Sequence, residues 1–418
     1  MSKTFKQWLT WMESCHPVEI ELGLERCHRV LERLLNNNLT IPVITVAGTN
    51  GKGSTVAVLE ALVKQAGLKP LVYTSPHFID YKERLKFDGH WLTDAEHVAA
   101  FEAVEKARES EQLTYFEFAT LAALKMAEQL PIDVLILETG LGGRLDAVNV
   151  IKADIAIITT VDYDHQDWLG DDLVSIAREK AGIAHKDKQV IIADPEFPPS
   201  IIEEIELRTD HVFIANRDFR HLDANNGWSW ENSQLGSWSF DYFTFPFANA
   251  SAALQAWFLL NANQELTESF AEQAFSKIAL SGRFETVAQC PDVILDVAHN
   301  PQAFRVMSEL LSKQSFNGKT HIILGMLDDK NAKACLTPLL ALVDQWYLSD
   351  LQGSRGRSAN NLKQLLNDSE IDGNQLQCYS SPLEAYKAAC LSASKEDRIL
   401  VTGSFYTVAP VLKLVREK

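Results

Sequence analysis

The sequence predicts an α/β protein of two domains. The chain has 418 residues, more than a single hydrophobic core usually supports. Short apolar, β-branched runs alternate with helical patterns in both halves, which favours parallel strands joined by helices. The first such run, 41–47, leads into a glycine-rich loop and a helix start. We therefore expect two α/β domains.

The glycine-rich loop lies within Ile41–Thr55, which reads IPVITVAGTNGKGST. Backbone N–H groups of such a loop turn inward, and the dipole of the following helix adds positive potential, so the loop predicts a phosphate site. Lys52 would reach the β- and γ-phosphates, and Ser54 or Thr55 could offer a hydroxyl to Mg²⁺. The spacing differs from the common P-loop, because only two residues separate Gly48 from Gly51 and a glycine follows the lysine. The predicted nucleotide contacts here are Thr49, Asn50, Gly51, Lys52, Gly53 and Ser54.

Composition limits the classes of function. A formal charge of −17 argues against a general nucleic-acid binder, and 46% hydrophobic with 23% charged residues is typical of a globular protein. The N-terminus has no apolar signal region, and no run approaches the ~20 apolar residues of a membrane span. Six cysteines without CxxC spacing suit reduced thiols better than a disulfide frame or a zinc site. We expect a cytoplasmic protein that binds neither nucleic acid nor membrane.

The first half begins with apolar residues at helical spacing between 5 and 38, which predict a helical lead-in. Further elements follow in alternation: a helix at 56–66 closed by Gly67, a strand at 71–74, a helix at 94–108, a helix ending near 127, and strands at 132–137 and 154–161. Ser75, Glu138 and His165 each follow a strand, at the edge where open α/β sheets bind ligands. A carboxylate that ends a buried strand, as Glu138 does, must be paired or must coordinate a metal.

From 194 to 246 the periodicity is poor, but alternation in 228–230 and 237–240 predicts short antiparallel strands with tryptophans on one face. Asn249 opens a helix that runs to about 260, where a role as its N-cap would explain it. The second domain then shows strand patterns at 292–297, 319–325, 345–349, 376–380 and 398–403, with helices between them. Asp296 and His299 stand in the loop after the first of these strands.

Several segments resemble one known family. GTNGKGST resembles the ATP loop of the Mur-ligase superfamily, in particular its folate branch, the folylpolyglutamate and dihydrofolate synthases. Other resembling segments are ELGLER (21–26), LTYFE (113–117), ETGLGGRLD (138–146), SGRFE (281–285) and DVAHNP (296–301). Serine replaces the usual proline at 281, which leaves the arginine of that hinge motif in place. The resemblance extends over essentially the whole chain. It implies a Mur-ligase central domain of P-loop type over 1–281, a hinge linker at 282–289 and a Rossmann-like Mur-ligase C-terminal domain over 290–418.

The resemblance implies site residues that the residue patterns alone leave open. Metal ligands would be Ser54, Ser75, Glu138, His165 and Lys180, the last carbamylated to give an oxygen donor. ATP would also contact Asn249, Arg283 and Asp296, and His299 would lie near glutamate and the transferred phosphate. The pterin pocket would use Leu22, Gly23, Leu24, Thr114, Tyr115, Phe116, Glu117 and Asp146. Without the resemblance, Lys180 would be a solvated charge, Arg283 an exposed salt-bridging residue, and Tyr115 and Phe116 core residues.

The implied activity is an ATP-dependent amide ligation with Lys52, Lys180 and His299 in catalytic roles. A carboxylate would attack the γ-phosphate, and L-glutamate would then displace phosphate from the acyl phosphate, with Mg²⁺, two ions being expected, and a monovalent cation as possible cofactors. Closure of the domains about 281–289 would exclude water. The pteroate-type segments favour the bifunctional form, which uses dihydropteroate and also extends reduced folates. We expect a monomer.

Three alternatives stay open at this level. The chain could act on reduced folates alone, as a synthase confined to polyglutamylation. It could be a muramyl ligase of the same superfamily, although only 40 residues precede Ile41 and leave no room for a UDP-binding domain. It could also be a non-catalytic ATP-dependent switch, which would bind nucleotide and form no amide.

Overall fold

The computed structural model describes residues 3–16, 18, 20–37, 39–224, 227–241, 246–260, 266–314, 316–353, 355–369 and 371–417. Two compact units divide the chain, with residues 1–242 and 247–278 in the first and residues 243–246 and 279–418 in the second. The expected linker at 282–289 lies within the second unit and contains a strand, β12 (Glu285–Ala288), which pairs with the sheet of that unit. The polar, short sequence of β12 gave no clear strand pattern.

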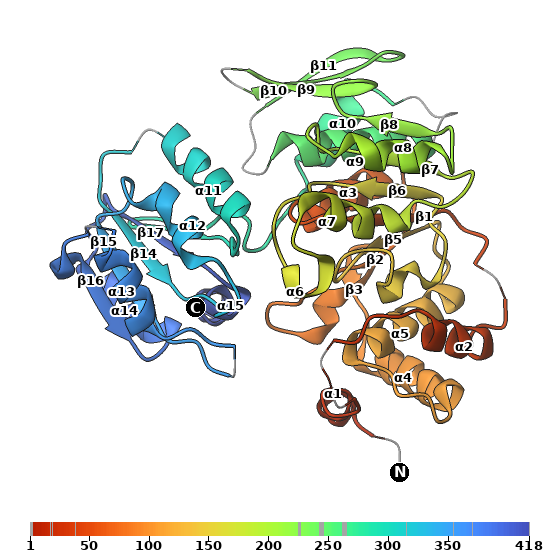
Figure 1. Cartoon of the computed structure of the whole chain (residues 1–418), viewed down its shortest axis with the longest axis horizontal. Helices are drawn as coiled ribbons and strands as arrows, with labels where there is room; N and C mark the ends of the chain where they lie inside the picture. Colours follow the sequence, from red (N-terminus) through yellow and green to blue (C-terminus); the bar gives the residue numbers. More distant parts are fainter. Residues whose placement is uncertain are drawn as a thin grey trace. The chain divides into compact units, whose positions relative to one another are not determined.

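The first unit is built on an eight-stranded sheet (Figure 1). Its order is β4-β3-β2-β5-β1-β6-β7-β8, in which β3 and β4 are antiparallel to their neighbours and the other strands run parallel. The strands are β1 (Val43–Ala47), β2 (Pro70–Tyr73), β3 (Leu85–Phe87), β4 (His90–Trp91), β5 (Val134–Glu138), β6 (Ile155–Ile158), β7 (Gln189–Ile192) and β8 (Val212–Ile214). The parallel strands β1, β5 and β6 are buried throughout, as expected of strands covered on both faces.

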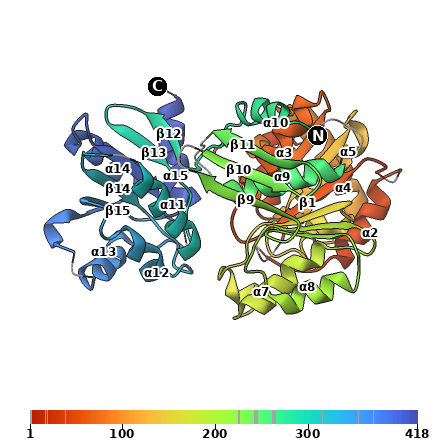
Figure 2. The ribbon, with the colours of Figure 1, turned by 90° about the horizontal axis from the view of Figure 1, so that it is seen from above.

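Helices cover both faces of this sheet (Figure 2). On one face, side chains of β1, β2 and β5 share a hydrophobic core with α1 (Phe5–Met12), α2 (Glu25–Leu34), α4 (Asp94–Arg108) and α5 (Tyr115–Gln129), while β6 and β7 share one with α7 (Leu173–Lys180) and α8 (Pro199–Glu206). On the other face α3 (Lys52–Gln65) packs against α9 (Phe247–Leu260) and α10 (Glu268–Phe275). The short helices are α6 (Gln166–Leu169), η1 (Tyr81–Arg84), η2 (Ala147–Val150) and η3 (Ala181–Ile183).

A separate three-stranded antiparallel sheet belongs to the first unit, with the order β11-β10-β9. Its strands are β9 (Phe219–Ala224), β10 (Gly227–Asn232) and β11 (Gly236–Asp241). The tryptophans predicted to share one face do so: Trp228 faces Phe240 and Trp230 faces Trp238 across the β10–β11 pair, with ring centroids 4.9 and 5.0 Å apart.

The second unit contains a six-stranded sheet with the order β12-β13-β17-β14-β15-β16, parallel except for β12. All five predicted strands are present: β13 (Asp292–Leu295), β14 (Thr320–Leu324), β15 (Gln345–Ser349), β16 (Leu376–Tyr379) and β17 (Arg398–Thr402). The helices are α11 (Pro301–Lys313), α12 (Ala332–Leu336), η4 (Thr337–Leu339), α13 (Ala359–Asn367), η5 (Gly373–Gln375), α14 (Pro382–Ser392) and α15 (Phe405–Arg416).

Three predictions need correction. The helical lead-in is two helices, α1 and α2, and the segment Glu21–Leu24 between them is not helical. Asn249 is the third residue of α9 rather than its N-cap, since the helix begins at Phe247. The patterns also missed β7, β8, β9 and α8, as well as the β3–β4 hairpin at Asp88-Gly89. In the part of the chain described above, no helix has the length and apolarity needed to span a membrane.

Candidate functional site

The phosphate loop joins β1 to α3 and is held by the chain that leaves β6. The Thr49 amide donates to the Thr160 carbonyl at 2.7 Å, and the Asn50 amide donates to Thr160 Oγ1 at 3.1 Å. In return, Thr159 Oγ1 donates to the Asn50 carbonyl at 2.6 Å. Glycine is required at 48, because a Cβ there would lie 1.8 Å from Thr159 Oγ1. The sequence pattern located this loop but not the two threonines that fix it.

Helix α3 begins at Lys52, so Gly53 and Ser54 lie in its first turn. The Lys52 amine donates to the Gly48 carbonyl at 2.8 Å and to the Thr49 carbonyl at 3.3 Å, which keeps it over the loop. Gly51 has φ +86°, and Asn249 Oδ1 lies 2.3 Å from where its Cβ would be. Asn249 is therefore seated against the phosphate loop, as a residue that contacts nucleotide would be.

Hydroxyl groups suited to a hard cation stand at the start of α3. Ser54 and Thr55 are both buried, and Thr55 Oγ1 has no hydrogen-bond partner among the residues that the structure describes. An orphaned hydroxyl in a phosphate loop fits an Mg²⁺ ion, which prefers oxygen ligands and keeps a near-octahedral set of them.

Glu138 and Ser75 meet at the carboxyl edge of the sheet. Glu138 is the last residue of β5 and is 5% exposed, and one of its carboxylate oxygens accepts a hydrogen bond from the Ser75 amide at 3.2 Å. The side chain is thus not at the surface. In the described chain no three His, Cys, Asp or Glu side chains converge as a metal cage. A single buried carboxylate such as that of Glu138 fits Mg²⁺, which is commonly bound through one or two carboxylates together with substrate phosphates.

His165 and Lys180 lie on the segments that follow β6. His165 stands at the start of α6 with φ +52°, and its amide donates to Asp164 Oδ1 at 2.9 Å. Lys180 ends α7 and is only 3% exposed, so it is not a solvated surface charge. Burial first, and then the charge of Lys52, lower the pKa of Lys180 to about 7 against the opposing pull of Asp164 and Asp146. A large fraction of this amine is therefore neutral at physiological pH.

Asp146 closes the loop that begins after Glu138. It is buried, and its two oxygens accept from the amides of Leu141 at 2.7 Å and Val148 at 3.0 Å. Burial raises the pKa of this carboxyl to about 6, although these amides and the Lys52 charge oppose the rise.

The two aromatic rings of the 113–117 segment contact different groups. Phe116 packs on Gly140, where a Cβ would lie 2.7 Å from its Cζ, and its ring is 6.0 Å from that of Tyr73. Tyr115 lies beneath the Arg84 guanidinium, at 5.3 Å from its ring centroid. Consecutive helix positions point about 100° apart, so the two rings do not form one stacking pair.

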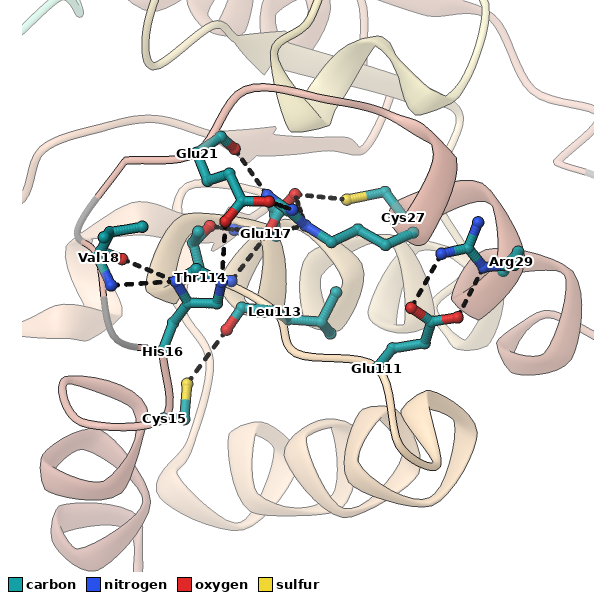
Figure 3. Close-up of polar contacts among 11 residues, drawn as sticks. Cys15, His16, Val18, Glu21, Cys27, Arg29, Glu111, Leu113, Thr114 and Glu117 are labelled. Atoms are coloured by element: carbon teal, nitrogen blue, oxygen red, sulfur yellow. Dashed lines mark hydrogen bonds and ion pairs between the residues drawn. The ribbon is translucent and has the colours of Figure 1, made fainter.

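A polar pocket of about 430 Å³ lies beside this region. It is lined by His16, Glu21, Leu22, Gly23, Glu25, Arg26, Arg29, Glu111 and Gln112. Leu22 and Gly23, both predicted to bind pterin, are among these residues, whereas Leu24 is not. Figure 3 shows how this neighbourhood is connected, with Glu117 and Thr114 at its centre.

Further polar contacts at the carboxyl edge were not found from the sequence. Arg84 is buried, and its Nε donates to His77 Nδ1 at 2.8 Å, two residues beyond Ser75. Burial first, and then the Arg84 charge, lower the pKa of His77 to about 4. His77 is therefore neutral and carries its proton on Nε2. A histidine in the loop that follows β2 was the available signal for this contact.

In the second unit, Asp296 and His299 stand after β13 as predicted. Asp296 accepts from the amides of Ala298 at 2.7 Å and Phe284 at 2.9 Å. Burial raises the pKa of this carboxyl, and the charge of Arg283 opposes the rise. His299 Nδ1 lies 2.8 Å from the Val297 carbonyl, so Nδ1 carries the proton. The Arg283 guanidinium lies 5.6 Å from the centre of the Phe405 ring.

Two family models match this arrangement. The Mur ligase middle domain matches residues 46–226, and the Mur ligase glutamate ligase domain matches residues 282–405. The fold and the phosphate loop thus define an ATP-dependent, amide-forming ligase of the Mur type.

Relatives specify the branch. The chain is 38% identical to the dihydrofolate synthase/folylpolyglutamate synthase of Escherichia coli K12 over 98% of this chain and 94% of that protein. It is 37% identical to the Haemophilus influenzae enzyme of the same name, over 96% and 95%. The chain belongs to the dihydrofolate synthase/folylpolyglutamate synthase family, whose members ligate glutamate to folate-type acceptors at the expense of ATP.

Solved structures agree over the full length. A structure of E. coli FolC in complex with DHPP and ADP superposes with a TM-score of 0.93 at 37% identity, covering 100% of this chain and 98% of that one. A bifunctional folylpolyglutamate synthase/dihydrofolate synthase with Mn, AMPPNP and L-glutamate bound gives 0.90 at 39% identity, covering 99% and 98%. Those relatives bind nucleotide, a divalent ion and small-molecule substrates, and the predicted two-domain α/β class is confirmed.

Proposed function

We propose that this chain joins L-glutamate to 7,8-dihydropteroate and adds further glutamates to reduced folates. The observation that carries the proposal is the loop 138–146, which begins at Glu138 beside Ser75 and ends at Asp146. The charge of Lys52 acts on the Asp146 carboxyl, so the phosphate loop and this acceptor loop share one neighbourhood. An acceptor carboxylate held there could reach the γ-phosphate of a nucleotide in the loop.

The reaction would proceed in two transfers. The acceptor carboxylate attacks the γ-phosphorus, the bond to the β,γ-bridging oxygen breaks, and acyl phosphate and ADP result. The amine of glutamate then attacks the acyl carbon, phosphate leaves, and the amine nitrogen loses a proton. The loop amides and Lys52 bind and orient the phosphates, and Asn249 supports the loop at Gly51. Arg283 and Asp296 are assigned to the nucleotide, and His299 to glutamate or the departing phosphate.

A divalent ion, when bound, would neutralise charge on the transferred phosphoryl group. Ser54, Ser75, Glu138, His165 and, after carbamylation, Lys180 would hold the divalent ions between them, with His165 on a second ion. The buried Lys180 amine, with its pKa of about 7, supports that modification, because CO₂ adds to a neutral amine with loss of a proton. We further propose a second Mg²⁺, a monovalent cation, a monomeric state and a cytoplasmic location without nucleic-acid or membrane partners.

The test is ADP release with purified chain, MgATP and L-glutamate, supplied in turn with dihydropteroate and tetrahydrofolate. Turnover with both acceptors is expected, and mass spectrometry should find the glutamyl amide. Turnover with tetrahydrofolate alone would reduce the chain to polyglutamylation, and turnover only with a muramyl acceptor would move it to another branch. Glu138→Ala should abolish turnover; nucleotide binding without any amide product would indicate a switch.

A further inference from the structure

Arg26 connects three parts of the chain near the polar pocket. It stands in the first turn of α2, and its Nε donates to both carboxylate oxygens of Glu117, at 2.8 and 3.0 Å. Its Nη2 donates to the Glu21 carbonyl at 2.7 Å, and its Nη1 pairs with the Glu21 carboxylate. The Arg26 side chain is 14% exposed and that of Glu117 is 5% exposed, so water screens this pair weakly.

Glu117 carries the connection to the start of α5. One of its oxygens accepts from the Thr114 amide at 2.8 Å and from Thr114 Oγ1 at 2.9 Å, which closes the capping box of that helix. The Cys27 thiol donates to the other oxygen at 3.3 Å. Figure 3 shows this carboxylate at the centre of the network, between α2 and α5. A single buried carboxylate thus fixes the first turns of two helices.

The Glu21–Leu24 loop depends on the same arginine. These residues lie in neither a helix nor a strand. Arg26 holds Glu21 through both the carbonyl and the carboxylate of that residue. His16 Nε2 lies 3.3 Å from the second Glu21 oxygen, which fixes the chain further upstream. Glu21, Leu22 and Gly23 of this loop line the pocket of about 430 Å³ together with Arg26. The shape of that pocket therefore follows from where Arg26 holds the loop.

We propose that Arg26 is a positioning residue for the acceptor substrate. It holds the Glu21–Leu24 loop against the start of α5 and so sets the KM for the pterin-containing acceptor, while the nucleotide site is left unchanged. The inference rests on the proposed function and on the family resemblance, which assigns Leu22, Gly23 and Leu24 of this loop to the pterin.

The forked geometry explains why this position needs arginine. One planar guanidinium serves two carboxylates and a carbonyl at once, and a lysine ammonium keeps the charge but cannot reproduce the fork. Arg33, two turns further along α2, offers a matched comparison. It pairs with Glu109, whose side chain is 65% exposed, and more distantly, at 3.8 Å, with Glu111, but it does not itself line the pocket. Exposed ion pairs of that kind contribute little to the stability of the folded chain.

The experiment compares Arg26→Lys, Glu117→Gln and the control Arg33→Lys in the full chain. We expect Arg26→Lys and Glu117→Gln each to raise the KM for dihydropteroate about tenfold, as the loss of a charge-assisted hydrogen bond would. The KM for ATP and the Kd for ADP, measured by calorimetry, should stay within about twofold of wild type. The dihydropteroate KM of the double variant should be no higher than that of the more impaired single variant, because the two residues act as one unit. Arg33→Lys should behave as wild type.

Two results would overturn the inference. One is a dihydropteroate KM in Arg26→Lys equal to that of Arg33→Lys. The other is a matching loss of ADP affinity together with a lower melting temperature, which would mean a structural role only. If the wild-type enzyme turns over with tetrahydrofolate alone, the dihydropteroate assignment is refuted. The inference then still stands if Arg26→Lys raises the KM for tetrahydrofolate by the same factor. If neither pterin supports turnover, the inference and the proposed function both fail.

Discussion

Thr159→Val tests whether the segment after β6 sets the shape of the phosphate loop. Thr159 is 1% exposed, and its hydroxyl donates to the Asn50 carbonyl at 2.6 Å. Valine has nearly the same shape, so the substitution removes the hydroxyl without opening a cavity. The Asn50 carbonyl then loses its shorter hydrogen bond.

The magnitude follows from the partners that remain. A buried acceptor left without any partner costs about 1–3 kcal/mol. Here Thr160 Oγ1 also donates to the Asn50 carbonyl, at 3.1 Å, so the loss should fall at the low end, about 1 kcal/mol. If the loop must regain this shape to bind phosphate, that energy appears as a Kd for ADP about fivefold weaker.

The assay is ADP titration by isothermal calorimetry. Thr159→Ser keeps the hydroxyl and should bind ADP as wild type does. Thr209→Val is the matched control, because Thr209 is also buried and its hydroxyl donates to the Lys188 carbonyl at 2.8 Å, a contact made at the start of β7. Wild-type affinity in Thr159→Val, or an equal loss in Thr209→Val, would refute the reasoning.

Three further predictions follow from single positions. Gly51→Ala places a side chain at φ +86° against Asn249, so ADP affinity should fall about tenfold, whereas Gly67→Ala, at φ +75° with open space around it, should lower only the melting temperature. Carbamylation of Lys180, followed by ¹³C NMR with labelled bicarbonate, should increase as pH rises through about 7, because the neutral amine is the reactive form; Lys180→Arg should abolish the signal. Burial raises the pKa of Asp397, but hydrogen bonds, two of them from backbone amides, outweigh burial and hold this pKa at about 2, below its ordinary 3.8. The ionised carboxylate therefore stabilises the folded state fully above about pH 4, and this stabilisation is lost as pH falls through about 2. Asp397→Asn should therefore lower the melting temperature at neutral pH and make no difference near pH 2.

Much of the fold could be predicted because its signals are local. The strands of the second unit are short apolar runs between turn residues, and all five were found within a few residues of their bounds. The β3–β4 hairpin had a local signal too, since Asp88 and Gly89 both take positive φ, as a two-residue Asp-Gly turn requires. Strand β12 and helix α8 had weak sequence patterns. Strand pairing with β13 and packing against β6 and β7, respectively, determine their structure instead.

In the candidate site, too, local patterns could be read from the sequence, whereas contacts between distant residues could not. The order of strand, glycine loop, lysine and hydroxyl predicted the phosphate site, because all of its parts lie within fifteen consecutive positions. The position of Asn249 against Gly51, some two hundred residues away, could only be borrowed from a resemblance. Its place inside α9 excludes the N-cap alternative, which the residue pattern could not do.

The sequence by itself determined the two-domain α/β class and predicted a nucleotide site in the glycine-rich loop, since periodicity and motif spacing are properties of neighbouring residues. Tertiary structure decided which side chains share an environment. The contact of Ser75 with Glu138 and the pairing of Arg26 with Glu117 join residues far apart in the chain. The lowered pKa of Lys180 arises from burial and from the charge of Lys52. Both depend on packing and on distance in space rather than on order along the chain.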